Sequence, residues 1–270
     1  MLRVVLLALL GVGICSVTAQ DLFSADKPAA TIEKSAAEKK AAQELRRQKV
    51  LADAAEKQKN APVVPPRTGK SETTVLFNGK DLTGWTGQPE HWSVKDGVIV
   101  GKNNNPVKVS TYLLTKESYD DFRLLATVKL VESEMHSGIA IWGRQAPDKG
   151  APYTYAGPLV MFPCGWGMYD LFGREGLGVD GNPGRKVGKQ HDWNELEILA
   201  QGNRLRVVAN GTQIVDWRDP EPDRLKKGPI GLQLHANDVP QEIHFKDLKI
   251  TTYPEDKLIT LKSDTTEAAK

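Results

Sequence analysis

The sequence has only two cysteines among its 270 residues, Cys15 and Cys164. Cys15 lies in an N-terminal segment that we expect to be removed, so the mature chain would keep one thiol and could form no internal disulfide. An exported domain without disulfides must be held together by its hydrophobic core alone. The lone thiol of Cys164 is more typical of core packing than of catalysis.

The sequence also lacks a large excess of either charge. It has 36 Lys and Arg residues and 34 Asp and Glu residues, which gives a net charge of +2. No basic face with interleaved aromatic residues is present, so nucleic acid has no support as a partner. The sequence contains no H-x-H, H-E-x-x-H or G-x-S-x-G motif. The common zinc-hydrolase and serine-hydrolase patterns therefore have no support either.

The only long apolar run, Val4–Ile14, is too short to cross a bilayer comfortably. Arg3 precedes it, and Val17 and Ala19 place small residues at the −3 and −1 positions of a cleavage site. This pattern predicts a signal peptide over residues 1–19. We therefore expect an exported protein, periplasmic or extracellular, with no stable membrane span after cleavage. A short membrane anchor is the alternative.

Residues 20–70 differ in composition from the rest of the chain. Ala29–Lys59 consists largely of Ala, Lys, Glu, Arg and Gln, with no Gly, Pro or aromatic residue, and these are strong helix formers. Its few apolar residues form no heptad, so we expect a charged, solvated and partly helical spacer rather than a coiled coil. The prolines after it, between residues 62 and 66, predict a stiff extended link.

From Thr73 onward the hydrophobic period changes to two. Phe122–Leu130 places an apolar side chain at every second position, and Lys95–Gly97 and Asn210–Thr212 read as hairpin turns between apolar runs. Many short strands without a long helical period predict an all-β domain over residues 73–253, with two antiparallel sheets packed face to face. Residues 254–270 form a polar tail that we expect to fray.

Strand alternation separates core positions from candidate site positions. Ile139 and Ile141 share one face of a strand, and the other face carries His136, Trp142 and Arg144. A large aromatic residue beside Arg and His favours a ligand-facing surface over a solvated one. Sugar-binding sites typically combine aromatic and planar polar side chains in this way. The C–H faces of a sugar pack on indole rings, and its hydroxyl groups form hydrogen bonds with planar polar groups.

The same alternation places Gln233 and His235 on the face opposite Leu232 and Leu234. Glu195 and Glu197 also share the non-core face of their strand, but for these two we expect water as the neighbour, as antiparallel sheets allow.

A long insert over residues 151–185 is rich in Gly and Pro and poorly periodic. Such inserts are either functional loops or structural loops, here held closed by an Asp–Arg pair. Its candidate binding or catalytic side chains are Trp166, Tyr169, Asp170, Arg174 and Glu175. Cofactors are unknown. A divalent cation is left open, because Asp170, Glu175 and Gln233 could supply oxygen ligands, although their spacing fits no known loop pattern.

Several motifs together resemble the 3-keto-disaccharide hydrolase family, formerly a domain of unknown function. The resemblance begins with Leu76–Trp85 (LFNGKDLTGW) and Trp92–Ile99 (WSVKDGVI) and ends with Gly228–His235 (GPIGLQLH). Shorter matches lie between them, at Ser137–Ile139, Tyr169-Asp170, Gly173-Arg174, Asp192–Glu195 and Asn210-Gly211. The match runs from about Val75 to Thr251. Each motif is weak alone, but their order makes the resemblance specific.

The resemblance implies a concanavalin-like jelly roll with a concave sugar-binding face. It also implies action on glycosides oxidised at C3 of glucose. A ketone at C3 acidifies the proton on C2, so a general base can remove it, and the substituent at C1 then leaves. Such a site needs a base, an oxyanion stabiliser and an acid.

For these roles we predict His235 as the general base, with Arg174 or Gln233 stabilising the enolate and Asp170 orienting Arg174. His136 is the next candidate for the base. Substrate binding is assigned to His136, Trp142, Arg144, Trp166, Tyr169 and Glu175.

One departure from the family pattern bears on activity. Many members carry a polar stretch such as Gly-Tyr-Glu-Val-Gln on a middle strand, which aligns here with Gly157–Met161 (GPLVM) and has no acidic residue. Either another residue supplies that function or this copy is a non-catalytic glycan-binding or surface-interaction module. The sugar, the aglycone and the oligomeric state are not readable from the sequence.

Overall fold

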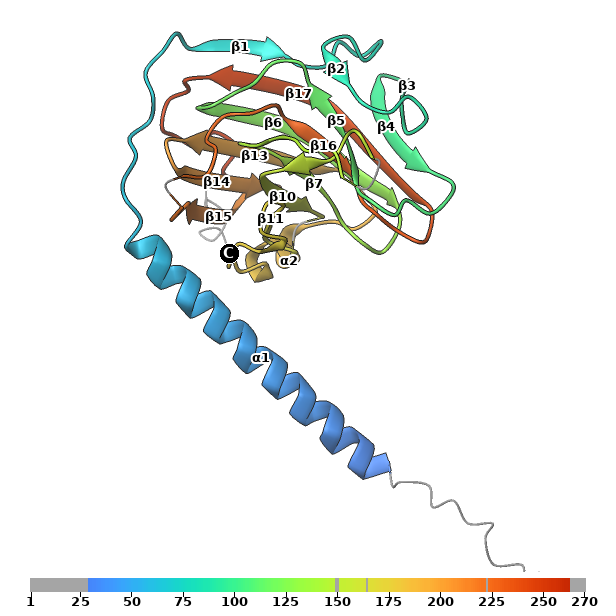
Figure 1. Cartoon of the computed structure of the whole chain (residues 1–270), viewed down its shortest axis with the longest axis vertical. Coiled ribbons are helices and arrows are strands. Elements are labelled where there is room, and N and C mark those ends of the chain that lie inside the picture. Colours follow the sequence, from blue (N-terminus) through green and yellow to red (C-terminus); the bar gives the residue numbers. More distant parts are fainter. Residues whose placement is uncertain (1–28, 149–150, 164, 222, 263–270) are drawn as a thin grey trace, which may run out of the picture. The chain divides into compact units, whose positions relative to one another are not determined.

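The computed structural model describes residues 29–148, 151–163, 165–221 and 223–262 (Figure 1). By its contacts the chain divides into two units, residues 1–46 and 47–270. The expected signal peptide and the lone thiol of Cys164 lie outside the described residues. The spacer forms one long helix, α1 (Ala29–Lys59), as its composition predicts. In the described part of the chain, no helix is long and apolar enough to span a membrane.

Two antiparallel sheets form the body of the second unit (Figure 1). The larger sheet is 8-stranded, in the order β15-β14-β13-β6-β17-β4-β3, with β1 also paired to β17. Its strands are β1 (Glu72–Val75), β3 (Trp92–Lys95), β4 (Val98–Asn103), β6 (Phe122–Glu132), β13 (Asn194–Gln201), β14 (Arg204–Ala209), β15 (Thr212–Arg218) and β17 (Gln241–Thr252).

The smaller sheet is 7-stranded, in the order β12-β11-β10-β7-β16-β5-β2. Its strands are β2 (Trp85–Thr86), β5 (Thr111–Thr115), β7 (Ser137–Ala140), β10 (Pro158–Phe162), β11 (Met168–Asp170), β12 (Glu175–Gly176) and β16 (Gly231–Leu234). A separate pair, β8 (Arg144–Gln145) and β9 (Tyr155–Ala156), and the short helix α2 (Asn182–Val187) complete the described elements. The predicted all-β sandwich is confirmed.

The core lies between the two sheets and is built by the expected alternation. Every second residue of β6 from Phe122 to Leu130 is at most 4% exposed. Ile139 of β7, Leu232 and Leu234 of β16 and Phe245 of β17 join the same cluster. Full burial of each such side chain stabilises the fold by roughly 1.5–3 kcal/mol, so the apolar face of each strand fixes which of its residues are left for a site.

The two predicted hairpins form with the turn chemistry that their sequences indicate. Lys95 pairs with Val98, and the two residues between them, Asp96 and Gly97, have φ of 50° and 74°. In the β14–β15 turn, Asn210 and Gly211 have φ of 52° and 89°. Positive φ at both central residues matches the right-handed twist of the flanking strands, which is why Asp-Gly and Asn-Gly are favoured there.

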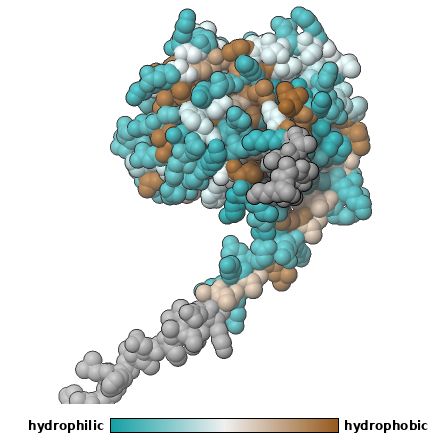
Figure 2. All heavy atoms as spheres, turned by 180° about the vertical axis from the view of Figure 1, so that it is seen from behind, coloured by the Kyte–Doolittle hydropathy of each residue, from teal (hydrophilic) through white to brown (hydrophobic). Residues whose placement is uncertain are grey.

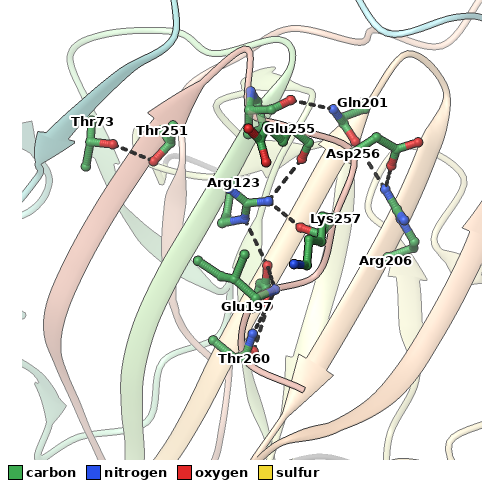
Figure 3. Close-up of polar contacts among 12 residues, drawn as sticks. Thr73, Arg123, Glu197, Gln201, Arg206, Thr251, Glu255, Asp256, Lys257 and Thr260 are labelled. Carbon is green, nitrogen blue, oxygen red and sulfur yellow. Dashed lines mark hydrogen bonds and ion pairs between the residues drawn. The ribbon is translucent and has the colours of Figure 1, made fainter. Parts of the chain in front are cut away.

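The C-terminal segment, residues 254–262, is bound to the larger sheet, contrary to the expectation that it frays (Figure 3). Glu197 of β13 is fully buried and accepts hydrogen bonds from the backbone N–H groups of Ile259 and Thr260. The solvated position expected for Glu197 is therefore wrong, whereas Glu195 on the same strand is exposed. These two partners follow Glu197 by more than sixty residues, so no local sequence pattern predicts them.

The proline-rich link forms no helix or strand over residues 62–71, and it contacts the sandwich. The Asn203 side chain donates to the Pro62 carbonyl at 2.7 Å and accepts from Val64 N–H at 3.2 Å. Arg67 donates from its backbone and its guanidinium to Asp121, which is fully buried. These bonds replace water as the partner of the link's backbone.

The surface of the sandwich offers no continuous apolar face in the view of Figure 2, where hydrophobic patches are broken up by hydrophilic residues. The exposed large hydrophobic residues are scattered over separate loops and strand ends; they include Met135, Trp166, Phe172 and Val239. Singly exposed residues of this kind are normal for a soluble domain. Recognition is therefore better sought in the cavities.

Candidate functional site

A cavity of about 640 Å³, here called the central pocket, lies on the side of the smaller sheet that faces away from the core. Val160 and Phe162 of β10 enter the inter-sheet core, while the alternate residues Leu159 and Met161 line the pocket. Its full lining is Lys108, Val109, Ser110, His136, Asp148, Leu159, Met161, Tyr169, Leu171, Arg174, Gln233, His235 and Ala236. The volume falls within the usual range for small-molecule sites.

His136 and His235 lie together at the edge of this pocket. His136 directly precedes β7 and His235 directly follows β16, and these antiparallel strands pair through Leu232 and Ile139. Continuing that register brings the two imidazoles side by side, with ring centroids 4.4 Å apart in an edge-on arrangement. The sequence placed both residues on the non-core face, and the pairing of the strands explains why they meet.

Both imidazoles are held in the neutral form at pH 7. Burial, together with a smaller effect of the nearby His235, lowers the pKa of His136 to about 4. Burial also lowers the pKa of His235, against a smaller opposing effect of a backbone hydrogen bond. In each ring Nδ1 is buried without a partner among the described residues. Because each ring is only half-buried, Nε2 is the nitrogen available to a ligand.

Gln241 holds the backbone of both histidines and was not anticipated from the sequence. Its side-chain oxygen accepts from His235 N–H at 2.8 Å, and its NH₂ group donates to the His136 carbonyl at 3.1 Å. Its own backbone N–H donates to the Asn103 side chain at 3.1 Å. Gln241 is fully buried at the first position of β17. A single amide at a strand end has no sequence signature, so only the fold reveals it.

Gln233 supplies a polar acceptor to the pocket. Its NH₂ group donates to the Tyr112 hydroxyl at 2.9 Å, and its Oε1 is buried without a partner in the described chain. One of its two amide N–H groups is thus engaged, while Oε1 is placed to accept from a ligand hydroxyl. Tyr112, which sequence reasoning missed, is fully buried, and that burial raises its pKa.

Arg174 and Tyr169 complete the predicted residues that line the pocket. The Arg174 side chain is 60% exposed and donates to the Asp148 carboxylate at 3.2 Å. Arg174 therefore places a guanidinium at the rim, and its field lowers the pKa of Tyr112 against the effect of burial. Such a cation can stabilise an oxyanion that develops in the pocket.

The predicted contact between Asp170 and Arg174 is replaced by two other ion pairs. Asp170 lies on β11, is 3% exposed, and accepts from Arg224 at 3.0 Å. Its other oxygen accepts from Phe172 N–H at 2.8 Å. The partner Arg224 comes from a loop fifty-four residues away, which a reading of the insert alone could not supply. Glu175 is exposed on β12 and does not line the pocket.

Trp142 and Arg144 are not where strand alternation put them. Trp142 is fully buried in the inter-sheet core, where its Nε1 donates to the Asp120 carbonyl at 2.7 Å. The reason is that β7 ends at Ala140 and Trp142 adopts φ of 49°, which breaks the period of two. Arg144 is exposed on β8, away from the pocket lining.

Trp166 lies beside the pocket rather than in its lining. It is 47% exposed, and its ring centroid is 4.7 Å from that of His136. An exposed indole next to a polar cavity is a surface on which the C–H face of a sugar can lie.

The wall formed by β10 carries no acid. Leu159 and Met161, from the stretch aligned with the polar family motif, line the central pocket. Among the described residues, no group of three or more His, Cys, Asp or Glu side chains is arranged as metal ligands would be. What the pocket does offer is two neutral imidazoles, an amide oxygen and a rim guanidinium, a set able to accept a proton and to bind hydroxyl groups.

Solved structures resemble this fold. A Parabacteroides distasonis protein provisionally described as a glycosyl hydrolase has 24% identity and a TM-score of 0.50, covering 67% of this chain and 93% of its own. A second such protein from that organism has 22% identity and a TM-score of 0.50, with coverage of 66% and 98%. A galectin-like Bacillus subtilis protein of unknown function has 12% identity and a TM-score of 0.50, with coverage of 69% and 99%. At these identities the likeness establishes the fold alone.

Curated proteins gave no match. The family model described as a 3-keto-alpha-glucoside-1,2-lyase-like domain matches residues 72–251, which is more than half of the chain and includes the whole lining of the central pocket. The resemblance carried by the ordered motifs is thereby confirmed, and the chain belongs to the family of 3-keto-alpha-glucoside-1,2-lyase-like domains.

Proposed function

We propose that the protein cleaves 3-keto-glucosides, including 3-keto-disaccharides, in the central pocket. The observation that carries the proposal is the pair of neutral imidazoles, His136 and His235, whose rings lie 4.4 Å apart at the pocket edge. A base must be unprotonated at working pH, and burial provides this by lowering both pKa values. Family membership supports the substrate class.

In this reaction His235 takes the proton from C2 of the oxidised sugar. The electron pair of the C2–H bond moves toward C3 and leaves negative charge on the ketone oxygen, which the Arg174 guanidinium, one of two cationic side chains in the lining, would stabilise. The enolate then collapses, the C1–O bond breaks, and the proton held by His235 passes to the leaving oxygen. Water adds across the resulting double bond and gives the free 3-keto-sugar.

Other parts of the pocket bind and orient the sugar. Gln233 Oε1 would accept from a ring hydroxyl, and Trp166 beside His136 would take a C–H face of the sugar. The β10 wall is apolar at Leu159 and Met161 and offers no base. The carboxylate in the lining, Asp148, is bonded to Arg174, so we assign the base to a histidine. We further propose that the reaction takes place outside the cytoplasm, on the ground of the signal-peptide pattern at residues 1–19.

The test compares turnover of a 3-keto-glucoside and the matching unoxidised glucoside by the chain that begins at Gln20. The wild type should release sugar from the 3-keto substrate only. His235→Ala should lower kcat by ~10²–10⁴ while sugar binding persists. The matched control is His191→Ala, because His191 is exposed and bonds to Glu134 outside the pocket.

Near-normal turnover by His235→Ala would refute the assignment of the base, and His136→Ala would then be the next variant. Saturable binding of the 3-keto-glucoside without any product from the wild type would refute catalysis and favour a glycan-binding module.

A further inference from the structure

A second cavity of about 640 Å³, here called the second pocket, adjoins the central pocket. The two share Lys108 and Val109 in their linings, so these residues form a ridge between them. The other lining residues of the second pocket are Gln88, Pro89, Glu90, His91, Trp92, Ser93, Lys102, Asn103, Asn104, Asn105, Pro106, Val107 and Ala151. A ligand that crosses the ridge can therefore occupy both cavities at once.

The ridge is fixed relative to the histidines. Val107 and Asn237 exchange two backbone hydrogen bonds of 3.0 and 2.9 Å. Ser110 accepts from Ala236 N–H at 2.9 Å, directly beside His235. Backbone bonds on one side of the ridge and the Ser110 hydroxyl on the other therefore set the spacing between the two pockets, which is what a two-part ligand of defined length requires.

Asn103 shapes the loop that forms the far wall of the second pocket. Its NH₂ group donates to the Asn105 carbonyl at 2.7 Å, and its oxygen accepts from Gln241 N–H at 3.1 Å. The side chain of Asn103 is thus engaged in bonds that hold the loop, whereas the side chains of Asn104 and Asn105 are exposed. The side-chain amide of Gln241 also holds His136 and His235, so one buried residue links the loop, through its backbone N–H, to the candidate catalytic pair.

The chemistry of the second pocket suits a neutral polyhydroxyl ligand. Four of its lining side chains are amides, Gln88, Asn103, Asn104 and Asn105, and an amide group carries both donors and an acceptor. The charges nearly cancel, since Lys102 is paired with Glu242 at 2.7 Å and Lys108 and Glu90 carry opposite signs. An anionic or strongly apolar ligand would find little to bind.

An unpartnered donor in the wall adds an independent observation. Trp92 belongs to the inter-sheet core, where its ring contacts that of Phe245, and it also lines the second pocket. It is 4% exposed, and its Nε1 is buried with no partner among the described residues. Two other buried tryptophans are satisfied, because Trp85 donates to the Leu76 carbonyl and Trp142 to the Asp120 carbonyl, each at 2.7 Å. A buried donor without an acceptor is costly, and a ligand hydroxyl could accept from it.

We propose that the second pocket binds the leaving half of a 3-keto-disaccharide, an unoxidised hexose, while the oxidised ring lies in the central pocket. This inference rests on the proposed function. It makes the protein a disaccharide-cleaving enzyme whose preference over simple alkyl glucosides comes from the loop at Asn103–Asn105 and from Trp92.

The test measures KM for 3-keto-trehalose and for methyl 3-keto-glucoside, which lacks a second ring. The double variant Asn104→Ala/Asn105→Ala and the variant Trp92→Phe, which keeps a ring in the core, should each raise KM for 3-keto-trehalose. We expect about three- to tenfold per lost hydrogen bond, with the methyl glucoside unaffected. Gln213→Ala, an exposed amide on β15, is the control. Equal effects on both substrates, or on neither, would overturn the proposal.

If the wild type turns over neither substrate, the proposed function fails while the second pocket stays testable. Calorimetric titration with 3-keto-trehalose then decides: binding weakened in the Asn104→Ala/Asn105→Ala variant and kept in Gln213→Ala supports the second pocket. Unchanged binding, or no binding to the wild type, refutes it.

Discussion

Arg123 and Glu197 form an ion pair across adjacent strands, with Arg123 Nε 2.9 Å from Glu197 Oε1, on the outer face of the larger sheet (Figure 3). The side chains are 9% and 0% exposed. The remaining polar groups are satisfied by the C-terminal segment, since the Arg123 guanidinium donates to the Glu255 and Lys257 carbonyls while Glu197 accepts from Ile259 and Thr260. A buried pair satisfied in this way is costly to break.

We predict that Glu197→Ala lowers the free energy of unfolding by about 3–5 kcal/mol, because it leaves Arg123 as an uncompensated buried charge. Glu195→Ala is the control on the same strand; this residue is exposed, and its loss should change stability by no more than about 0.5 kcal/mol. Urea denaturation followed by circular dichroism measures both. Similar values for the two variants would contradict the prediction.

We predict that His136 makes the protein less stable in mild acid. Its folded pKa is about 4 and its ordinary value is 6.5, so between these values the unfolded chain binds more protons than the folded one. Stability is then complete above pH 6.5 and falls as the pH drops toward 4. A shift of this size corresponds to about 3 kcal/mol.

The variant His136→Gln cannot titrate and should lose this slope. Unfolding free energies measured at intervals from pH 7 to pH 4.5 provide the check, with His191→Gln as the control. If the His136→Gln protein and the wild type have the same slope, His136 is not held neutral by the fold.

We predict that Arg224→Met destabilises the fold far more than Arg204→Met. Arg224 donates to Asp170 at 3.0 Å and lies 3.5 Å from Asp219, and both carboxylates are buried. Its loss should cost about 3–5 kcal/mol. Arg204 pairs with Asp216 at 2.6 Å, but the side chains are 38% and 46% exposed, and surface pairs contribute about 0–1 kcal/mol.

Thermal unfolding of the two arginine variants decides this prediction. Because Asp170 neighbours the pocket residue Tyr169 on β11, Arg224→Met should also raise KM for the 3-keto substrate. A stable variant with an unchanged KM would show that the Asp170 contact does not support the pocket.

The fold was predictable because its signals are local. Alternation over Phe122–Leu130 and the Asp96-Gly97 and Asn210-Gly211 turns each specify their own strands or hairpins without reference to distant residues. The same alternation placed Gln233 and His235 on the face that forms the central pocket. The alternation failed for Trp142 because β7 ends at Ala140 and Trp142 itself has a positive φ, which ends the two-residue period of the strand.

The missed parts of the site depend on partners far away in the sequence. Asp170 pairs with Arg224 rather than with nearby Arg174, and Glu197 is buried by residues that follow it by more than sixty positions. Gln241 contacts three separate strand ends, at Asn103, His136 and His235. Sequence pattern assigns a face to each side chain, but it cannot tell which distant loop will cover that face.

The C-terminal segment has a consequence for how the chain is made. During synthesis, β6 and β13 emerge well before residues 254–262, so the hydrogen bonds of Arg123 and Glu197 are completed only after these later residues have been made. Until then the larger sheet presents an unsealed, charged outer face. A chain cut after Tyr253 would keep every described strand of the sandwich and the whole lining of the central pocket, yet it would leave Arg123 and Glu197 without these partners on the outer face.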